Sequence, residues 1–303
     1  MDNLTEIGII GVGNMGHHFA RRFLNNGYKL VIYDKNQEAL SYFENENAYI
    51  ADSPKEVADR VEIVFVSLPT PAIVKQVAMG ENGIIFGNKI NTYVDLSTTG
   101  QKVGIEVAKG LEEKGIRTLD APVSGGVQGA VKGTLAVMAS GEKIVFEKIS
   151  PMLNIIGKNV FYVGNKIGQA QIVKVANNLL SGAALAITSE AVVLGKKAEI
   201  DPEVLISIFN AGSGRNTATT DKFPKSILTG KFDYGFTTDL MYKDLKLCME
   251  LAEELDVPMW LGSGVTQLWK YAVTQGGGNR DFTTIVNYLE EMVGIAEDQP
   301  ANT

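Results

Sequence analysis

Residues 167–197 read IGQAQIVKVANNLLSGAALAITSEAVVLGKK and predict a single long helix. The stretch contains no proline, and apolar residues cover most of its circumference, which is typical of a helix buried on nearly all sides. Gln171, Lys174, Asn178 and Ser181 recur at spacings of three and four residues, so they form a polar ridge along one face. Because buried ammonium and amide groups need partners, this ridge is a candidate functional site.

Lys174 has two interpretations. A lysine in an apolar helix commonly extends its ammonium to the surface or pairs with a core carboxylate. Burial, in contrast, disfavours the charged form and lowers the pKa toward the range in which the amine exchanges a proton at neutral pH. The motifs in the rest of the chain favour this second interpretation.

The chain before the long helix begins with a predicted strand, Glu6–Ile10, which leads into the sequence GVGNMG and then a helical run. Three glycines at this spacing permit a tight turn, close approach of the backbone to a pyrophosphate, and close packing of the helix on the strand. The helix N-terminus would then face the phosphates. The predicted cofactor contacts in this turn are Gly11, Val12, Gly13, Asn14 and Met15.

A second predicted strand, Lys29–Tyr33, leads directly to Asp34. A carboxylate at this position can accept hydrogen bonds from the adenine ribose hydroxyls, and it would repel the 2′-phosphate of NADP. The predicted cofactor is therefore NAD, although the neighbouring Lys35 could offset part of that repulsion.

Further strands alternate with helices, and several are continuously apolar, as expected for parallel strands covered on both faces. The further predicted strands are Glu62–Ser67, Thr92–Leu96, Arg117–Leu119, Thr134–Ala139 and Asn159–Val163. The expected fold is α/β: a Rossmann-type doubly wound parallel sheet over residues 1–165, then an all-helical domain over residues 166–303 that begins with the long interdomain helix.

Polar loops follow the strands of this sheet. Ligands of open α/β sheets bind at the carboxyl ends of the strands, so the loop with Leu68 and Pro69 and the loop at 95–99 are expected to line the nicotinamide half of the cofactor. In the sequence DAPVSGG, at 120–126, two glycines after Ser124 let successive backbone N–H groups converge on an anion. A plain turn is the alternative for that segment.

Composition excludes several classes of function. A formal net charge of −7 without a basic stripe argues against a nucleic-acid partner. No signal peptide and no run of about 18 uncharged apolar residues are evident, so we expect a cytoplasmic protein without a membrane partner. The single cysteine and the adjacent His17 and His18, which point to different helix faces, predict no metal site. Lysine is then the natural acid or base.

Five ordered motifs give the chain a family resemblance. They are GVGNMG at 11–16, DLST at 95–98, DAPVSGG at 120–126, KVANN at 174–178 and KDL at 243–245. In these motifs the chain resembles the β-hydroxyacid dehydrogenase family, which includes the 3-hydroxyisobutyrate dehydrogenases, over almost its whole length. One departure is Ala170, where the family usually has a glycine four residues before its lysine.

The resemblance implies roles for particular residues. Lys174 would be the catalytic lysine and Asn178 its partner. The acid group of a small hydroxy-acid or aldehyde-acid substrate would be held by Ser124, Gly125 and Gly126. Further cofactor contacts would come from Thr98, Lys243 and Asp244. Family members usually bury the helical domain against another subunit, which implies a homodimer or homotetramer.

The second half of the chain contributes one further candidate, Arg215, in a glycine-rich loop. It is either a surface charge or a bidentate clamp for a second acidic group on the substrate.

The expected function is NAD-linked interconversion of a small 3-hydroxy acid and its semialdehyde or keto acid, with Lys174 as general acid and base. A sulfonated aldehyde or an imine could replace this substrate. A non-catalytic NAD-binding module is the remaining alternative. The presence of Lys174 argues against both the imine and the non-catalytic module.

Overall fold

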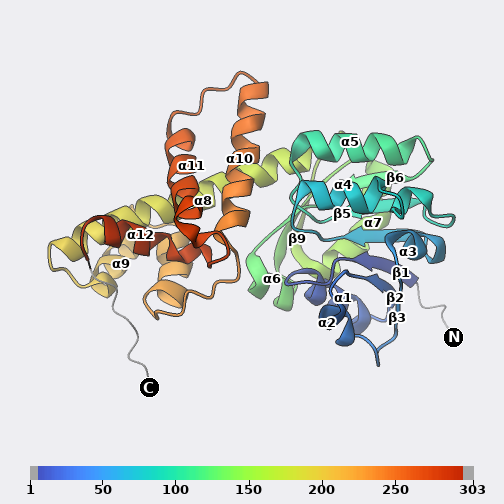
Figure 1. Cartoon of the computed structure of the whole chain (residues 1–303), viewed down its shortest axis with the longest axis horizontal. Coiled ribbons are helices and arrows are strands. Elements are labelled where there is room, and N and C mark those ends of the chain that lie inside the picture. Colours follow the sequence, from blue (N-terminus) through green and yellow to red (C-terminus); the bar gives the residue numbers. More distant parts are fainter. Residues whose placement is uncertain (1–5, 296–303) are drawn as a thin grey trace. The chain divides into compact units, whose positions relative to one another are not determined.

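The computed structural model describes residues 6–295 (Figure 1), and the chain divides into two compact units between Lys174 and Val175. The division falls within helix α8 (Gln169–Lys197), which corresponds to the long helix predicted from sequence. Each unit has its own hydrophobic core and is described by itself.

The first unit is built on a mostly parallel sheet. Its strands are β1 (Glu6–Ile10), β2 (Lys29–Tyr33), β3 (Ala48–Ile50), β4 (Ile63–Val66), β5 (Thr92–Asp95), β6 (Arg117–Asp120), β7 (Val123–Ser124), β8 (Leu135–Ser140) and β9 (Gly157–Gly164). Their order is β3-β2-β1-β4-β5-β6-β8-β7, with β9 also paired to β8. Pairing is parallel from β3 through β6, whereas β8 runs antiparallel to β6 and β7.

Helices cover both faces of this sheet (Figure 1). They are α1 (Gly16–Asn25), α2 (Gln37–Ser41), α3 (Pro54–Arg60), α4 (Pro71–Met79), the 3₁₀ turn η1 (Ile84–Phe86), α5 (Gly100–Glu112), α6 (Gly126–Lys132) and α7 (Lys143–Ile156). Neighbouring strand residues serve opposite faces: Ile9 packs into the cluster that contains Phe19 of α1, and Ile10 packs into the cluster that contains Val57 of α3. The predicted doubly wound fold is confirmed.

The strand order reverses between β1 and β4, since β2 and β3 lie on one side of β1 while β4 to β6 lie on the other. In doubly wound sheets this reversal opens a crevice beyond the carboxyl ends of the two strands, where ligands bind. The loops after β1, β4 and β5 therefore frame the expected ligand position.

The second unit is helical, as predicted. Its elements are the remainder of α8, α9 (Pro202–Ala211), the π-helix η2 (Ala218–Ile227), α10 (Thr238–Glu254), α11 (Trp260–Ala272), the short η3 (Val273–Gly277) and η4 (Phe282–Thr284), and α12 (Ile285–Met292). Asp201 caps α9 by accepting a hydrogen bond from the Glu203 N–H at 2.8 Å. The core of this unit centres on the buried rings of Trp269, Phe223 and Phe282.

By length and composition alone, α8 could cross a membrane. Half of its most apolar stretch is buried inside the protein, however, and core helices of water-soluble proteins pass the same test.

Candidate active site

The three glycines of the first turn have different surroundings. Gly11 has a φ of +88°, and a Cβ there would lie 2.2 Å from the Ser67 carbonyl oxygen. A Cβ on Gly16 would lie 1.8 Å from the Gly11 carbonyl oxygen, so these two positions exclude any side chain. A Cβ on Gly13 would meet nothing within 4 Å. The backbone at Gly13 therefore faces open space, as a turn that receives a pyrophosphate requires.

Asp34 is held against this turn. Its Oδ2 accepts a hydrogen bond from the Val12 N–H at 2.8 Å, and its Oδ1 accepts one from the Asn36 N–H at 2.9 Å. The carboxylate follows β2, the parallel neighbour of β1, and is half-buried. A fixed carboxylate beside the glycine turn fits the adenine ribose of a dinucleotide.

The loops after β4 and β5 are joined to each other. The Ser97 hydroxyl accepts a hydrogen bond from the Leu68 N–H at 2.9 Å, and the Ser97 N–H donates to Asp95 Oδ1 at 2.8 Å. Ser97 thereby links the loop that carries Leu68 and the exposed Pro69 to its own loop, which carries the half-buried Thr98.

The DAPVSGG segment contains an unusual backbone. Ser124 ends β7, and the next two residues, Gly125 and Gly126, have φ values of +133° and +65°. Both angles lie in the region that favours glycine. Asp120, at the start of the motif, is buried and faces the beginning of α8, where it accepts hydrogen bonds from the Gly168 N–H and, at 3.3 Å, from the Ser140 hydroxyl. Burial raises the pKa of this carboxyl group to about 6.

The predicted polar ridge on α8 is buried. Gln171 is fully shielded, Lys174 is 8% exposed and Asn178 is 7% exposed, while Ser181 is half-buried. Lys174 and Asn178 are four residues apart, so their side chains leave the same face of the helix on consecutive turns.

In the second unit, Asn178 is connected to α10 through Asp244. The Asn178 Nδ2 donates a hydrogen bond to Asp244 Oδ2 at 2.5 Å. The Lys243 ammonium lies 2.9 Å from Asp244 Oδ1 and forms an ion pair with it. Three predicted site residues are thus brought together. Arg215 is exposed in the loop between α9 and η2, and it forms no ion pair with any residue from 6 to 295.

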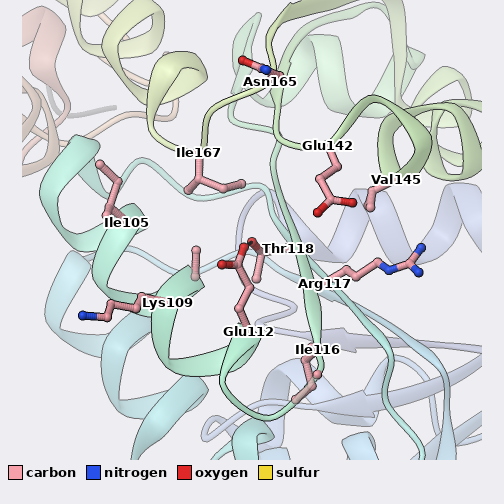
Figure 2. Close-up of a pocket in the computed structure, with 12 residues that line it drawn as sticks. Ile105, Lys109, Glu112, Ile116, Arg117, Thr118, Glu142, Val145, Asn165 and Ile167 are labelled. Atoms are coloured by element: carbon pink, nitrogen blue, oxygen red, sulfur yellow. Dashed lines mark hydrogen bonds between the residues drawn. The ribbon is translucent and has the colours of Figure 1, made fainter.

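A separate cavity of about 620 Å³ lies in the first unit, between α5, the beginning of β6, the start of α7 and the segment between β9 and α8 (Figure 2). Figure 2 shows the carboxylates of Glu112 and Glu142 directed into this space, where Glu112 also lies near the Thr118 hydroxyl. No predicted site residue lines this cavity. It is therefore distinct from the edge of the sheet at which the cofactor is expected.

Comparison with known proteins agrees with this geometry. The family model described as the NAD-binding domain of 6-phosphogluconate dehydrogenase matches residues 6–164, and that described as NAD-binding of NADP-dependent 3-hydroxyisobutyrate dehydrogenase matches residues 168–289. A 2-(hydroxymethyl)glutarate dehydrogenase from Eubacterium barkeri is 36% identical over 297 residues, which cover 98% of each chain. The chain belongs to the β-hydroxyacid dehydrogenase family.

Other members of the family are similarly close. The mitochondrial 3-hydroxyisobutyrate dehydrogenase of Mus musculus is 34% identical over 299 residues, covering 96% of this chain and 89% of the relative. The crystal structure of a 3-hydroxyisobutyrate dehydrogenase from Salmonella typhimurium superimposes with a TM-score of 0.84 at 27% identity, covering 94% of this chain and 99% of that chain. As a member of this family the protein is an NAD(P)-dependent dehydrogenase with a site for a nicotinamide dinucleotide.

Sequence reasoning assigned no role to three contacts that support the family motifs. They are the Ser97 bridge between two loops, the Asp120 contact with the start of α8, and the contact of Asp244 with Asn178. Each joins segments that are far apart in the chain. The sequence signal available was a polar residue in an apolar context, which indicates a partner without identifying it.

Proposed function

We propose that this protein interconverts a small 3-hydroxy acid and its semialdehyde or keto acid, with NAD as the hydride acceptor and Lys174 as the general acid and base. The observation that carries the proposal is a buried lysine on α8, one turn before an asparagine that a carboxylate holds in place. The neutral amine is the form that accepts a proton in oxidation, and the ammonium is the form that donates one in reduction.

In oxidation, neutral Lys174 removes the hydroxyl proton of the substrate while the carbon that bears this hydroxyl loses a hydride and forms a carbonyl. A nicotinamide ring, when bound, would supply the hydride acceptor. In reduction, the protonated Lys174 donates its proton to the oxygen as the hydride returns to the carbon.

Asn178 would orient the lysine or the reacting oxygen. A carboxylate accepts hydrogen bonds but does not donate them, so the contact with Asp244 requires the amide NH₂ of Asn178 to face Asp244. The amide oxygen consequently points away from Asp244. It accepts from Asn177 Nδ2 at 3.3 Å, and its second lone pair can accept from an ammonium or a hydroxyl. Asp244 thus fixes which end of the amide is offered to the reaction.

The remaining site residues have proposed roles in binding. Ser124, Gly125 and Gly126 would bind the substrate's acid group through a hydroxyl and backbone N–H groups, which the two positive φ values support. Arg215, which is exposed in its loop, would bind a second acid group where the substrate has one.

The cofactor contacts are likewise proposals. Asp34 favours NAD over NADP, and the remaining contacts would come from Gly11 to Met15, from Leu68, Pro69 and Thr98, and from Lys243 with Asp244.

We also propose that the protein acts in the cytoplasm as a homodimer or homotetramer. Leu180, Ile187 and Leu194 recur every seven residues on α8, and they are 73%, 60% and 73% exposed. Val204 and Ile208 of α9 are exposed as well. Apolar side chains arranged in a stripe are typical of a surface that another subunit covers.

Initial-rate measurements test the catalytic proposal. Purified wild-type protein would be assayed with NAD and 3-hydroxy acids, and with NADH and aldehyde acids, including a sulfonated aldehyde. We expect NAD-linked turnover of a carboxylic acid and loss of at least about 100-fold in kcat for Lys174→Ala, in keeping with general acid and base catalysis. Lys197→Ala, on the exposed end of the same helix, is the matched control.

Near-normal turnover by Lys174→Ala would rule out the lysine mechanism. Turnover of only the sulfonated substrate would keep the mechanism and change the substrate class. NADH binding without turnover of any substrate would favour an imine substrate or a non-catalytic role.

A further inference from the structure

We infer that Gln171 is a positioning residue that attaches the loop carrying Thr98 to the turn of α8 that ends at Lys174. The inference rests on the proposed function, because it assumes that Lys174 transfers the proton. The contacts that support it lie entirely within the first unit.

The side-chain amide of Gln171 has all its polar atoms engaged. Its Oε1 accepts hydrogen bonds from the N–H groups of Thr99, at 3.0 Å, and Gly100, at 3.3 Å. Its Nε2 donates to the Ser97 carbonyl oxygen at 3.0 Å. The orientation of the amide is chemically determined, since two N–H donors need the oxygen and a carbonyl needs the NH₂.

These contacts place Gln171 at the start of α5. The N-cap residue of this helix, Thr99, makes no side-chain capping hydrogen bond, and the first helical residue is Gly100. Gln171, which is 72 positions from Thr99 in the chain, supplies the missing acceptor. The first turn of α5 and the loop before it are therefore fixed by a residue of α8.

The connection extends to the neighbouring strand. Ser97, whose carbonyl accepts from Gln171, also accepts from the Leu68 N–H through its hydroxyl. One buried amide thus fixes the loops after both β4 and β5, where the nicotinamide half of the cofactor is expected. Thr98 lies between the two loop residues that Gln171 contacts.

The beginning of α8 is fixed independently. The Gly168 N–H donates to Asp120, and the Ala170 N–H donates to the Ser140 hydroxyl at 2.9 Å. These two contacts hold the helix on the sheet, whereas Gln171 holds the cofactor loops on the helix.

Lys174 follows Gln171 by three residues, so the two side chains leave neighbouring positions on one side of α8. Hydride and proton transfer require reacting atoms within about 3–3.5 Å, and a displacement of about 1 Å costs about 100-fold in rate. By fixing the distance between the cofactor loop and the lysine's helix turn, Gln171 would act on the chemical step without touching the substrate.

The test compares Gln171→Met with wild type. Methionine matches the length of glutamine and removes all three hydrogen bonds. We expect kcat to fall about 100-fold, as for a displacement of about 1 Å, while the substrate KM and the NADH dissociation constant change less than about threefold. The deuterium isotope effect on kcat should rise, because hydride transfer becomes more rate-limiting.

Two variants serve as controls. Gln169→Met alters the same residue type on the same helix, where the side chain accepts a hydrogen bond from the Lys166 N–H at 3.1 Å, and it should retain wild-type kcat. Gln171→Glu keeps an acceptor for the two N–H groups at the helix N-terminus but loses the donor to Ser97, so its kcat should be intermediate. This variant also provides the measurement if Gln171→Met does not fold.

Amide hydrogen exchange at Thr99 and Gly100 gives a readout that does not depend on catalysis. Exchange at both amides should accelerate in Gln171→Met and remain unchanged in Gln169→Met. The positioning role would be wrong if Gln171→Met kept the wild-type kcat. It would also be wrong if this variant had a lower melting temperature but unchanged turnover per NADH-binding site. Suppose instead that Lys174→Ala retained turnover and that exchange at Thr99 and Gly100 was still faster in Gln171→Met. The lysine mechanism would then be wrong, whereas the contact of Gln171 with the loop would stand.

Discussion

Asp244 Oδ2 and Asn178 Nδ2 lie 2.5 Å apart, so a fully buried carboxylate on α10 fixes the amide that follows Lys174 by one turn of α8. The other oxygen of this carboxylate lies 2.9 Å from the Lys243 ammonium. A single carboxylate therefore controls both the amide orientation on α8 and the position of a lysine on its own helix.

Replacing this carboxylate tests that control. Asp244→Leu removes the hydrogen bond from Asn178 and the ion pair with Lys243, and a hydrogen bond to a charged group is worth about 1.5–3 kcal/mol. We expect kcat/KM to fall by about 10- to 100-fold, with a smaller fall in Asp244→Asn, which keeps an acceptor for Asn178. The matched control is Asp239→Asn, because Asp239 carries an exposed carboxylate on the same helix. Steady-state kinetics of the three variants and of wild type are the measurement. Equal losses in the control and in Asp244→Leu would contradict the assignment.

Two glycines of the first turn should respond differently to the same substitution. Gly13→Ala adds a methyl group in open space at an ordinary φ, so the melting temperature should remain near that of wild type while NADH binds at least about 10-fold more weakly. Gly16→Ala places its Cβ 1.8 Å from a carbonyl oxygen and should lower the melting temperature markedly. Thermal unfolding and NADH fluorescence titration separate the two effects. Unaltered NADH affinity in Gly13→Ala would exclude this turn as the pyrophosphate site.

Asp34 should control the choice between NAD and NADP. Asp34→Ser removes the charge that would repel a 2′-phosphate, and the shorter serine side chain leaves space for that group. We expect the ratio of kcat/KM for NAD to that for NADP to fall by about 10-fold or more, since like charges brought together cost several kcal/mol. Glu38→Ser should leave the ratio unchanged, because it removes an exposed carboxylate of α2. A wild-type enzyme that already prefers NADP would refute the proposal directly.

The exposed stripe on α8 should determine the oligomeric state. Ile187→Asp introduces a charge into the middle of that stripe, and burying an unpaired charge in a subunit interface is costly. We expect a lower molar mass by light scattering at the same protein concentration. Ile144→Asp is the control, because Ile144 is 64% exposed on α7 of the first unit. A wild-type protein that is already a monomer would show that this stripe does not mediate self-association.

The fold was predictable because its signals are local. Continuous apolar runs identify β4 and its neighbours, and the glycine turn requires particular backbone angles that few other residues adopt. The strands β3 and β7 were not predicted, because segments of three and two residues are too short to show any periodicity. The position of β8 was predicted, but its antiparallel direction relative to β6 and β7 was not. Apolar content does not distinguish parallel from antiparallel pairing.

The candidate site was predictable only as a set of separate motifs. The sequence identifies Gln171 as a polar residue in an apolar helix, but nothing local indicates that its acceptor serves α5, 72 positions away. Asp120 is a similar case, because its partner at Gly168 is 48 positions distant and is a backbone N–H, which leaves no trace in the sequence. Such pairs depend on the three-dimensional register of α8 against the sheet, which composition and spacing do not determine.

Asp120 makes the stability of the folded protein depend on pH. Burial raises its pKa from 3.8 to about 6 in the folded protein, so between these values the folded state binds more protons than the unfolded state. Its contribution to the free energy of unfolding is therefore greatest below pH 3.8 and falls as the pH rises to about 6. At about 1.4 kcal/mol per pKa unit, the total change is about 3 kcal/mol.

Asp120→Asn should abolish this dependence, because the amide does not ionise but still offers an oxygen to the Gly168 N–H. Urea unfolding of both proteins between pH 4.5 and 7.5 would measure the pH dependence of the free energy of unfolding. The contributions of the other ionisable groups largely cancel when the two proteins are compared. Relative to the variant, wild type should lose stability as the pH rises through this interval and level off above pH 7. Parallel stability curves for the two proteins would mean that Asp120 ionises in the folded state as it does in the unfolded chain, and that the hydrogen bonds from Gly168 and Ser140 offset the cost of burial.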